Sequence, residues 1–129
     1  RLQSIPNFIS VFLTPVFGLS VDYYGNRTVL LALAGLLLIC AHSIIYTQLM
    51  DSAIFPLVLI GLAFSIFGSV IWPCIPITVA PDHQGTAYGV MTSFQNAGQF
   101  IVPLLLQFIY RQYVSFVPCE GFFIFLSVI

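Results

Sequence analysis

The sequence predicts an all-α membrane protein, a bundle of transmembrane helices, on three observations. The composition is 60% hydrophobic and only 5% charged, and the mean hydropathy is +1.07. Soluble domains carry about 25% charged residues to cover their water-facing surface, so a soluble globular domain and a disordered chain are both excluded. The few charges also leave long uncharged runs at residues 2–21, 28–50, 52–81 and 83–110. Each run can hold a helix of roughly 20 residues, the length that crosses a bilayer core.

We therefore expect four complete spans and the beginning of a fifth, at residues 4–21, 29–46, 54–71, 86–110 and 121–129. The chain starts with Arg1, stops inside an apolar segment and begins without the pattern of a signal peptide. We interpret it as a piece of a longer membrane protein.

Composition also limits the partners and cofactors. Three basic residues and a net charge of −1 provide no electrostatic surface for DNA or RNA, so nucleic acid is not an expected partner. The three scattered cysteines predict neither a disulfide framework nor a metal cluster. We expect no cofactor and no metal.

The first two spans differ in character. The first carries Asn7 and several hydroxyl side chains, which predicts that it faces other protein, and Asn7 becomes a candidate for a substrate pathway. The second is nearly all aliphatic and is expected to face lipid. His42 is the only titratable side chain well inside a span, and we interpret it as a packing histidine rather than a proton relay.

The third span places Gly61, Ser65 and Ser69 four residues apart, a stripe of small residues that lets helix backbones approach closely. Trp72 follows, with Pro73 and Pro76, and these prolines predict a kink or a helix end. A tryptophan at this place either stacks on a substrate or anchors the helix at the membrane interface.

Asp82 stands just before the fourth span, in Ala-Pro-Asp-His-Gln-Gly-Thr. We expect it to cap that helix by accepting free backbone amides, in preference to a catalytic or proton-carrying role. The other isolated charges, Asp51, Arg111 and Glu120, are interpreted as ordinary loop ends.

Polar side chains follow one narrow face of the fourth span. At 100° per residue this face collects Tyr88, Thr92, Gln95, Asn96 and Gln99. Such a stripe must meet protein or water, because unpaired amides are costly in hydrocarbon. Two interpretations remain open: hydrogen bonding that holds neighbouring helices together, or the lining of a substrate pathway.

The segment from Gly18 through Asp22 and Gly25 to Arg27 resembles the signature loop of the major facilitator superfamily, in which Gly, three residues, Asp, two residues and Gly precede a basic residue. A second block, Gly85 to Gly98, resembles the same superfamily in its pattern of small residues. Further short motifs resemble a branch of lysosomal dipeptide transporters: Pro15-Val-Phe-Gly18, Trp72-Pro73, His83-Gln84, Gly85-Thr-Ala-Tyr-Gly89 and Gln95-Asn96.

The resemblance implies a fragment of a major facilitator fold, comprising helices eight to eleven and the start of helix twelve. Helices eight and eleven would then face the missing N-terminal half, helix nine would lie outside, and helix ten would line the cavity with Ser65, Ser69 and Trp72. The implied partners are a small-molecule substrate, the lipid bilayer and that N-terminal half, with room for an accessory membrane subunit.

The resemblance also gives the first loop a role. Asp22 would engage the opposite half in one state of alternating access and release as the halves rock. Gly18 and Gly25 would permit close helix approach and a tight turn, and Arg27 would anchor the next helix on the cytoplasmic side. From the residues alone, Asp22 is equally readable as a helix cap.

The expected function is therefore transport of a small polar solute, and the branch resemblance implies dipeptides and the lysosomal membrane. Two alternatives remain: a carrier in the same superfamily for a sugar, organic anion or drug, and a membrane receptor or scaffold without transport. An enzyme is not expected, because the spans lack an acid pair, a histidine with metal-ligand partners or a nucleophile with a base.

Overall fold

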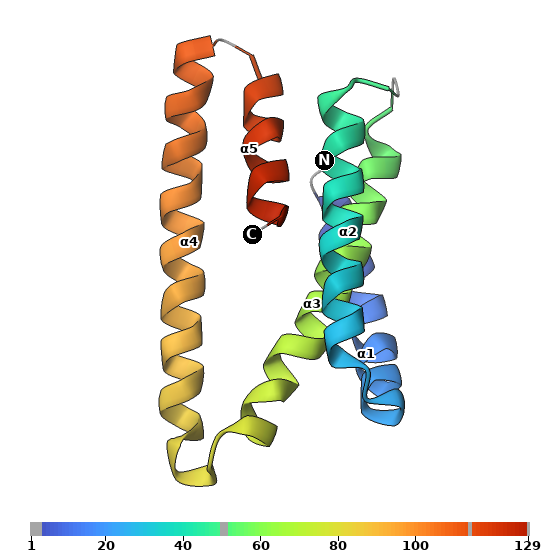
Figure 1. The fold of residues 1–129 in the computed structure, drawn as a ribbon, viewed down its shortest axis with the longest axis vertical. Coiled ribbons are helices and arrows are strands. Elements are labelled where there is room, and N and C mark those ends of the chain that lie inside the picture. The colour runs from blue at the N-terminus through green and yellow to red at the C-terminus, as the bar shows by residue number, and fades with distance from the viewer. Residues whose placement is uncertain (1–3, 50–51, 114, 129) are drawn as a thin grey trace.

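The computed structural model describes residues 4–49, 52–113 and 115–128, and within them the chain is helical with short connections. The elements are α1 (Ile5–Tyr24), α2 (Arg27–Tyr46), α3 (Ile54–Thr78), a short 3-10 helix η2 (Pro81–His83), α4 (Gln84–Tyr113) and α5 (Val117–Val128). The helices run alternately up and down, so that the α1–α2 turn and the α3–α4 connection lie at one end (Figure 1).

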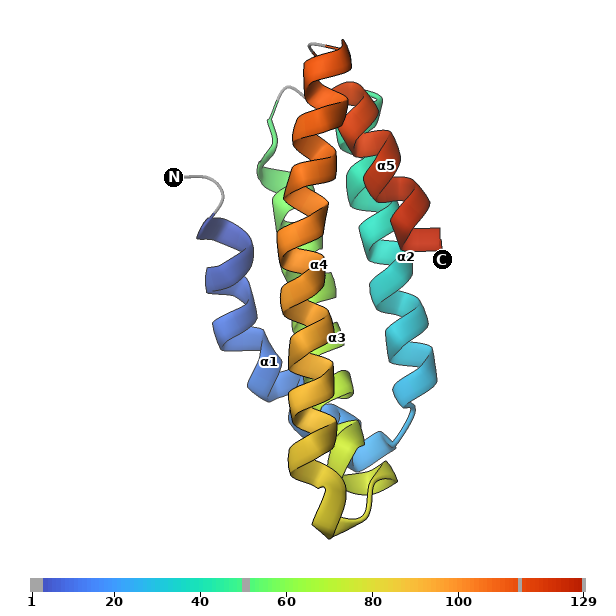
Figure 2. The same ribbon diagram turned by 90° about the vertical axis from the view of Figure 1, so that its left-hand side faces the viewer.

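Three helices form the packed part of the molecule. α3 lies against α1 and α2, and a small core gathers Ala34, Ala63 and Ile66 with flanking Phe17 and Leu37. In Figure 1, α5 lies between α4 and α2, and Figure 2 shows α1 and α2 on opposite sides of α3. α4 contributes no buried residue among those described.

The stripe of small residues on α3 explains how α1 approaches so closely. A Cβ placed on Gly61 would lie 3.0 Å from both the Cβ of Ile9 and the Cα of Pro6. Ser65 and Ser69 are buried further along the stripe. The prediction that this stripe packs against a neighbouring helix is confirmed, and the neighbour at Gly61 is α1.

The helix that holds the third span extends beyond residue 71, so Pro73 and Pro76 do not end it there. α3 continues to Thr78 as an unbroken helix through Pro73 and Pro76, although a proline inside a helix removes one backbone hydrogen bond. One of its last carbonyls, that of Pro76, accepts a hydrogen bond from the Gln84 side chain, at 3.4 Å. In Figure 1 this part of α3 swings away from α1 and α2 towards the start of α4.

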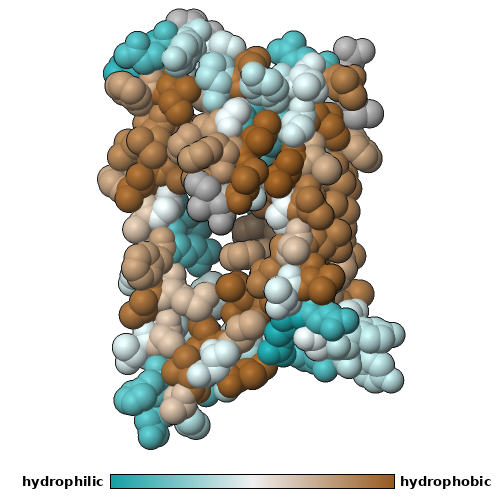
Figure 3. Space-filling view, viewed as in Figure 1, coloured by the Kyte–Doolittle hydropathy of each residue, from teal (hydrophilic) through white to brown (hydrophobic). Residues whose placement is uncertain are grey.

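Three described helices are long and apolar enough to cross a membrane, namely α1, α2 and α3. α4 has 30 residues, about 45 Å of helix, which exceeds a hydrocarbon core of about 30 Å, but its polar stripe makes it less apolar. Figure 3 shows a broad hydrophobic belt between two hydrophilic ends, interrupted by a hydrophilic patch halfway along α4.

Candidate functional site

A cavity of about 500 Å³ lies between α3 and α4. Its walls are aromatic and aliphatic, and one amide side chain joins them: Phe64, Phe67, Ile71, Trp72, Met91, Phe94 and Gln95. Both helices therefore contribute aromatic faces, and α4 contributes the hydrogen-bonding group. Such a site suits a small ligand that has an apolar part and a few polar groups.

Trp72 and Tyr88 join the two helices at one end of this cavity. Their rings are stacked, with centroids 6.1 Å apart and planes inclined by 13°. Pro76 has no N–H to donate to the carbonyl of Trp72, four residues earlier in α3. That carbonyl instead lies 3.5 Å from the Tyr88 hydroxyl, which donates a long hydrogen bond to it. Pro76, which predicted a kink or a helix end, thus frees an acceptor for the site.

The five polar residues of α4 all lie on its exposed surface. Thr92 donates to the carbonyl of Tyr88 in its own helix, at 2.8 Å. Among the residues that the structure describes, the side-chain amides of Gln95, Asn96 and Gln99 form no hydrogen bond. Among the described residues, Tyr88 is therefore the member of the stripe that bonds α4 to a neighbouring helix, and Gln95 is the member that lines the cavity.

Ser65 and Ser69 lie elsewhere than on the cavity wall. They are 0% and 3% exposed, and their hydroxyls donate within α3, to the carbonyl of Gly61 at 2.7 Å and to that of Ile66 at 2.8 Å. The stripe they share with Gly61 is occupied by helix packing, so the structure does not bring these two serines together with Trp72 and Gln95.

Asn7 is also separate from the α3–α4 cavity. It borders a shallow hollow of about 330 Å³ on α1, together with Ser4, Phe8 and Val11. Its side chain is exposed. The structure thus brings Trp72, Tyr88 and Gln95 together and leaves Asn7 outside this group.

The loop between α1 and α2 is a tight turn closed by one ion pair. Gly25 has φ 69°, in the left-handed region, and its N–H donates to the carbonyl of Val21 at 2.9 Å. Asp22 lies in the last turn of α1, and its Oδ1 is 3.5 Å from a terminal nitrogen of Arg27. The Asp22 side chain remains 66% exposed, so it is available to a further partner.

The other glycine of this loop motif has no close neighbour. A Cβ on Gly18 would meet no described atom within 4 Å, so the expected close helix approach is not made inside residues 4–49, 52–113 and 115–128. The tight turn at Gly25 is confirmed by its backbone conformation.

Asp82 lies inside the 3-10 turn that precedes α4, in its first turn as predicted for a favourable helix-dipole interaction. The predicted side-chain cap bond is not formed with any described residue. The connection is closed instead by Gln84, whose side-chain amide donates to the carbonyls of Val79 at 3.2 Å and Pro76 at 3.4 Å. The cap is lost because the helical backbone already begins at Pro81, ahead of Asp82.

One pair of residues was missed by the sequence interpretation. Glu120 is not at a loop end but in the first turn of α5, and its Oε2 lies 2.7 Å from Nδ1 of His42 on α2. The side chains are only 12% and 19% exposed for His42 and Glu120. The signal for the helix start was present, because Pro118 precedes Glu120 by two residues and proline favours a first turn. Asp51, grouped with Glu120 from the sequence, lies outside the described residues.

Comparison with known proteins gives one family match and several relatives. The family model described as Major Facilitator Superfamily matches residues 2–129. The chain is 32% and 33% identical, over 105 residues, to the lysosomal dipeptide transporter MFSD1 of Bos taurus and of Homo sapiens. These alignments cover 81% of this chain and 22% of each relative. The Danio rerio protein is 30% identical over 104 residues. The chain thus spans about a fifth of the length of these relatives. No solved structure gives a significant match.

Proposed function

The chain belongs to the major facilitator superfamily of multi-pass membrane transporters, and on this premise we propose that it is part of the C-terminal half of a solute carrier. In this proposal α1 to α4 are helices eight to eleven of the carrier, and α5 begins helix twelve. The remaining partners are the bilayer, the N-terminal half of the same transporter and, optionally, an accessory membrane subunit. Transport proceeds by rocking the two halves around a site near the middle of the membrane.

The observation that carries this function is the cavity between α3 and α4, with the Trp72–Tyr88 stack at one end and Gln95 in its wall. The aromatic walls can bury an apolar part of a solute, and the amide can hydrogen-bond to a carbonyl or an amine. Beyond Gln95 the exposed amides of Asn96 and Gln99 extend the polar face of α4. We assign this face to the substrate pathway, opposite the N-terminal half.

The substrate that best fits is a dipeptide, carried across the lysosomal membrane. The relatives of this chain are named lysosomal dipeptide transporters, and a peptide bond presents one donor and one acceptor to an amide such as Gln95. No charged side chain lines the α3–α4 cavity among the described residues. The charged termini of a dipeptide would therefore be bound by residues of the N-terminal half.

The first loop supplies a gate in this proposal. Asp22 is exposed in the last turn of α1 while paired with Arg27, so its carboxylate can exchange that partner for one in the N-terminal half. Exchange of an exposed ion pair costs little, because such pairs contribute about 0–1 kcal/mol. Arg27 would hold the loop at the cytoplasmic face.

Uptake by proteoliposomes that hold the full-length protein tests the function. We expect saturable uptake of a radiolabelled neutral dipeptide, and competition by other dipeptides but not by glucose or an organic anion. Saturable uptake of glucose or of the organic anion instead would retain the carrier and reject the dipeptide. Absence of flux for all three classes, with protein that binds a dipeptide, would favour a receptor on the same fold.

A further inference from the structure

We propose that His42 and Glu120 form a proton-binding site that clasps α5 to α2, and that the clasp tightens when the site takes up a proton. The proposal rests on their contact across the helix interface and does not depend on the transported solute. Nδ1 of His42 and Oε2 of Glu120 are 2.7 Å apart, the length of a charge-assisted hydrogen bond.

The protonation chemistry follows from the two groups. An ionised carboxylate can only accept, so Nδ1 of His42 carries the hydrogen and Nε2 of the neutral ring holds the free lone pair. Binding of one proton at Nε2 gives an imidazolium beside the carboxylate, and the net charge of the pair changes from −1 to 0. The hydrogen bond is thereby converted into an ion pair, which is the stronger interaction.

The two partners lie near helix ends whose dipoles have opposite signs. His42 lies one turn before the end of α2 at Tyr46, where the helix dipole is negative and stabilises a cation. Glu120 lies in the first turn of α5, where the dipole is positive and stabilises an anion. The two dipoles therefore add to the attraction within the pair.

The packing around the pair makes it a clasp rather than a loose contact. The ring of Phe123 stacks on the imidazole, with centroids 4.9 Å apart and planes inclined by 14°. At the residue next to Glu120, a Cβ on Gly121 would lie 3.6 Å from the ring of Tyr46. The imidazole is thus held between Phe123 and Glu120, both from α5.

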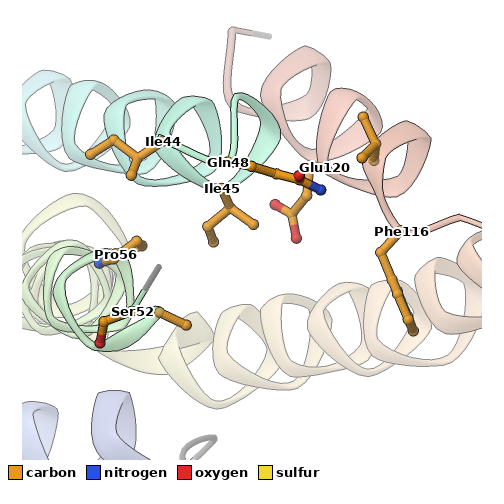
Figure 4. A pocket seen from close by; sticks show the side chains of 9 residues that line it. Ile44, Ile45, Gln48, Ser52, Pro56, Phe116 and Glu120 are labelled. Atoms are coloured by element: carbon orange, nitrogen blue, oxygen red, sulfur yellow. The ribbon is translucent and has the colours of Figure 1, made fainter. Parts of the chain in front are cut away.

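A route for protons is also present. Glu120 lines a cavity of about 390 Å³ that Gln48, Ser52 and Phe116 also border. Figure 4 shows the carboxylate of Glu120 directed into this cavity. The cavity lies at the end of α2 and the start of α5, so it gives access to the Glu120 member of the pair.

Among the described residues, the neighbouring elements supply no competing ion-pair partner. α2 itself presents Tyr46, α5 presents Cys119, and the ring of Tyr110 on α4 packs on Phe116 near the start of α5. Arg111, in the last turn of α4, makes no salt bridge to a described residue. The α3 side of the cavity is formed by Ser52, Ala53 and Pro56. Within the part of the chain that the structure describes, the salt bridges are Asp22–Arg27 and His42–Glu120.

Amide hydrogen exchange of the full-length protein, resolved to the peptide that covers α5, tests the clasp. The amides of Cys119 and Glu120 donate to the carbonyl of Phe116, so they exchange when the first turn of α5 opens. In Glu120→Gln we expect this opening to increase about tenfold over wild type at pH 5.5 and roughly twofold at pH 8. The variant loses an ion pair at pH 5.5 but only the weaker hydrogen bond at pH 8. Comparison with wild type at each pH cancels the intrinsic pH dependence of exchange.

His42→Gln provides an independent second variant and should give the same two ratios. His83→Gln replaces the exposed histidine of the η2 turn and should leave α5 at the wild-type level at both pH values. Equal ratios at pH 5.5 and pH 8, or an equal effect of His83→Gln, would overturn the proposal.

The wild-type protein alone also decides the matter if a variant does not fold. After correction for intrinsic exchange rates, protection of the first turn of α5 should rise as the pH falls from 8 to 5.5. Reaction of the buried Cys119 with a thiol reagent, corrected for thiolate content, should slow over the same range. Flat profiles for both quantities would reject a proton-linked clasp.

Discussion

The rings of Trp72 and Tyr88 stack nearly parallel, 6.1 Å apart, and so tie the end of α3 to the start of α4. Further hydrogen bonds reinforce the same end, from Gln84 to the carbonyls of Pro76 and Val79. The cavity opens beyond this junction, towards Phe64 and Phe94. The stack therefore sets how far apart the two walls of the proposed substrate site stand.

Removal of the Tyr88 ring should weaken substrate binding. An aromatic pair contributes about 0.5–1.5 kcal/mol beyond the area it buries, so Tyr88→Ala should raise the apparent KM of uptake by about threefold to tenfold. Tyr88→Phe keeps the ring and removes only the 3.5 Å hydrogen bond, so it should stay within about twofold of wild type. Tyr113→Ala, an exposed tyrosine in the last turn of the same helix, is the matched control. Equal KM values for all three variants would contradict a role of the stack in binding.

Gly61→Ala should destabilise the protein through the contact between α1 and α3. The new Cβ would lie 3.0 Å from backbone and side-chain atoms of Pro6 and Ile9, and overpacking of this kind costs about 1–3 kcal/mol. Gly68→Ala on the same helix meets no described atom within 4 Å and should be neutral or slightly stabilising, because alanine favours helix. The melting temperatures of the purified full-length variants measure both effects. A melting temperature of Gly61→Ala as high as that of Gly68→Ala would show that α1 does not pack here.

Local signals in the sequence were sufficient for several elements. The tight turn at Gly25 and the small-residue stripe at Gly61 depend on residues close in sequence, and both are present in the structure. The prolines of α3 predicted a kink or a helix end, because each removes a backbone hydrogen bond, and the helix continues through both of them. The Trp72 carbonyl that Pro76 frees faces the hydroxyl of Tyr88, 16 residues further along the chain, and local sequence patterns do not report such contacts.

Local sequence patterns predict less of the candidate site than of the helices. Helical periodicity correctly gathers Tyr88, Thr92 and Gln95 on one exposed face of α4, because that depends only on the helix. It does not say which neighbour each face meets, so Ser65 and Ser69 were assigned to a pathway although α3 buries them in packing. His42 and Glu120 are 78 positions apart in the sequence, and their contact depends on α5 lying beside α2.

Gly25→Ala should strain the turn between α1 and α2. The backbone at Gly25 has φ 69°, where a side chain costs about 1–2 kcal/mol for most residues. Asparagine tolerates this conformation better, so Gly25→Asn should lose clearly less stability than Gly25→Ala. Thermal unfolding of the two variants, side by side with wild type, measures the difference. Equal melting temperatures for the two variants would mean that the turn relaxes into another conformation.

Asp22→Asn should slow transport while leaving the fold almost intact. Its ion pair with Arg27 is 3.5 Å long and mostly exposed on the Asp22 side, so its loss should cost about 1 kcal/mol or less. If the same carboxylate also engages the N-terminal half, its loss should lower the maximal uptake rate severalfold with little change in KM, because the exchange between states is affected rather than binding. Asp82→Asn is the matched control, since Asp82 is exposed in the other connection at the same end. Uptake by Asp22→Asn at the rate of wild type would reduce Asp22 to a surface charge at the end of α1.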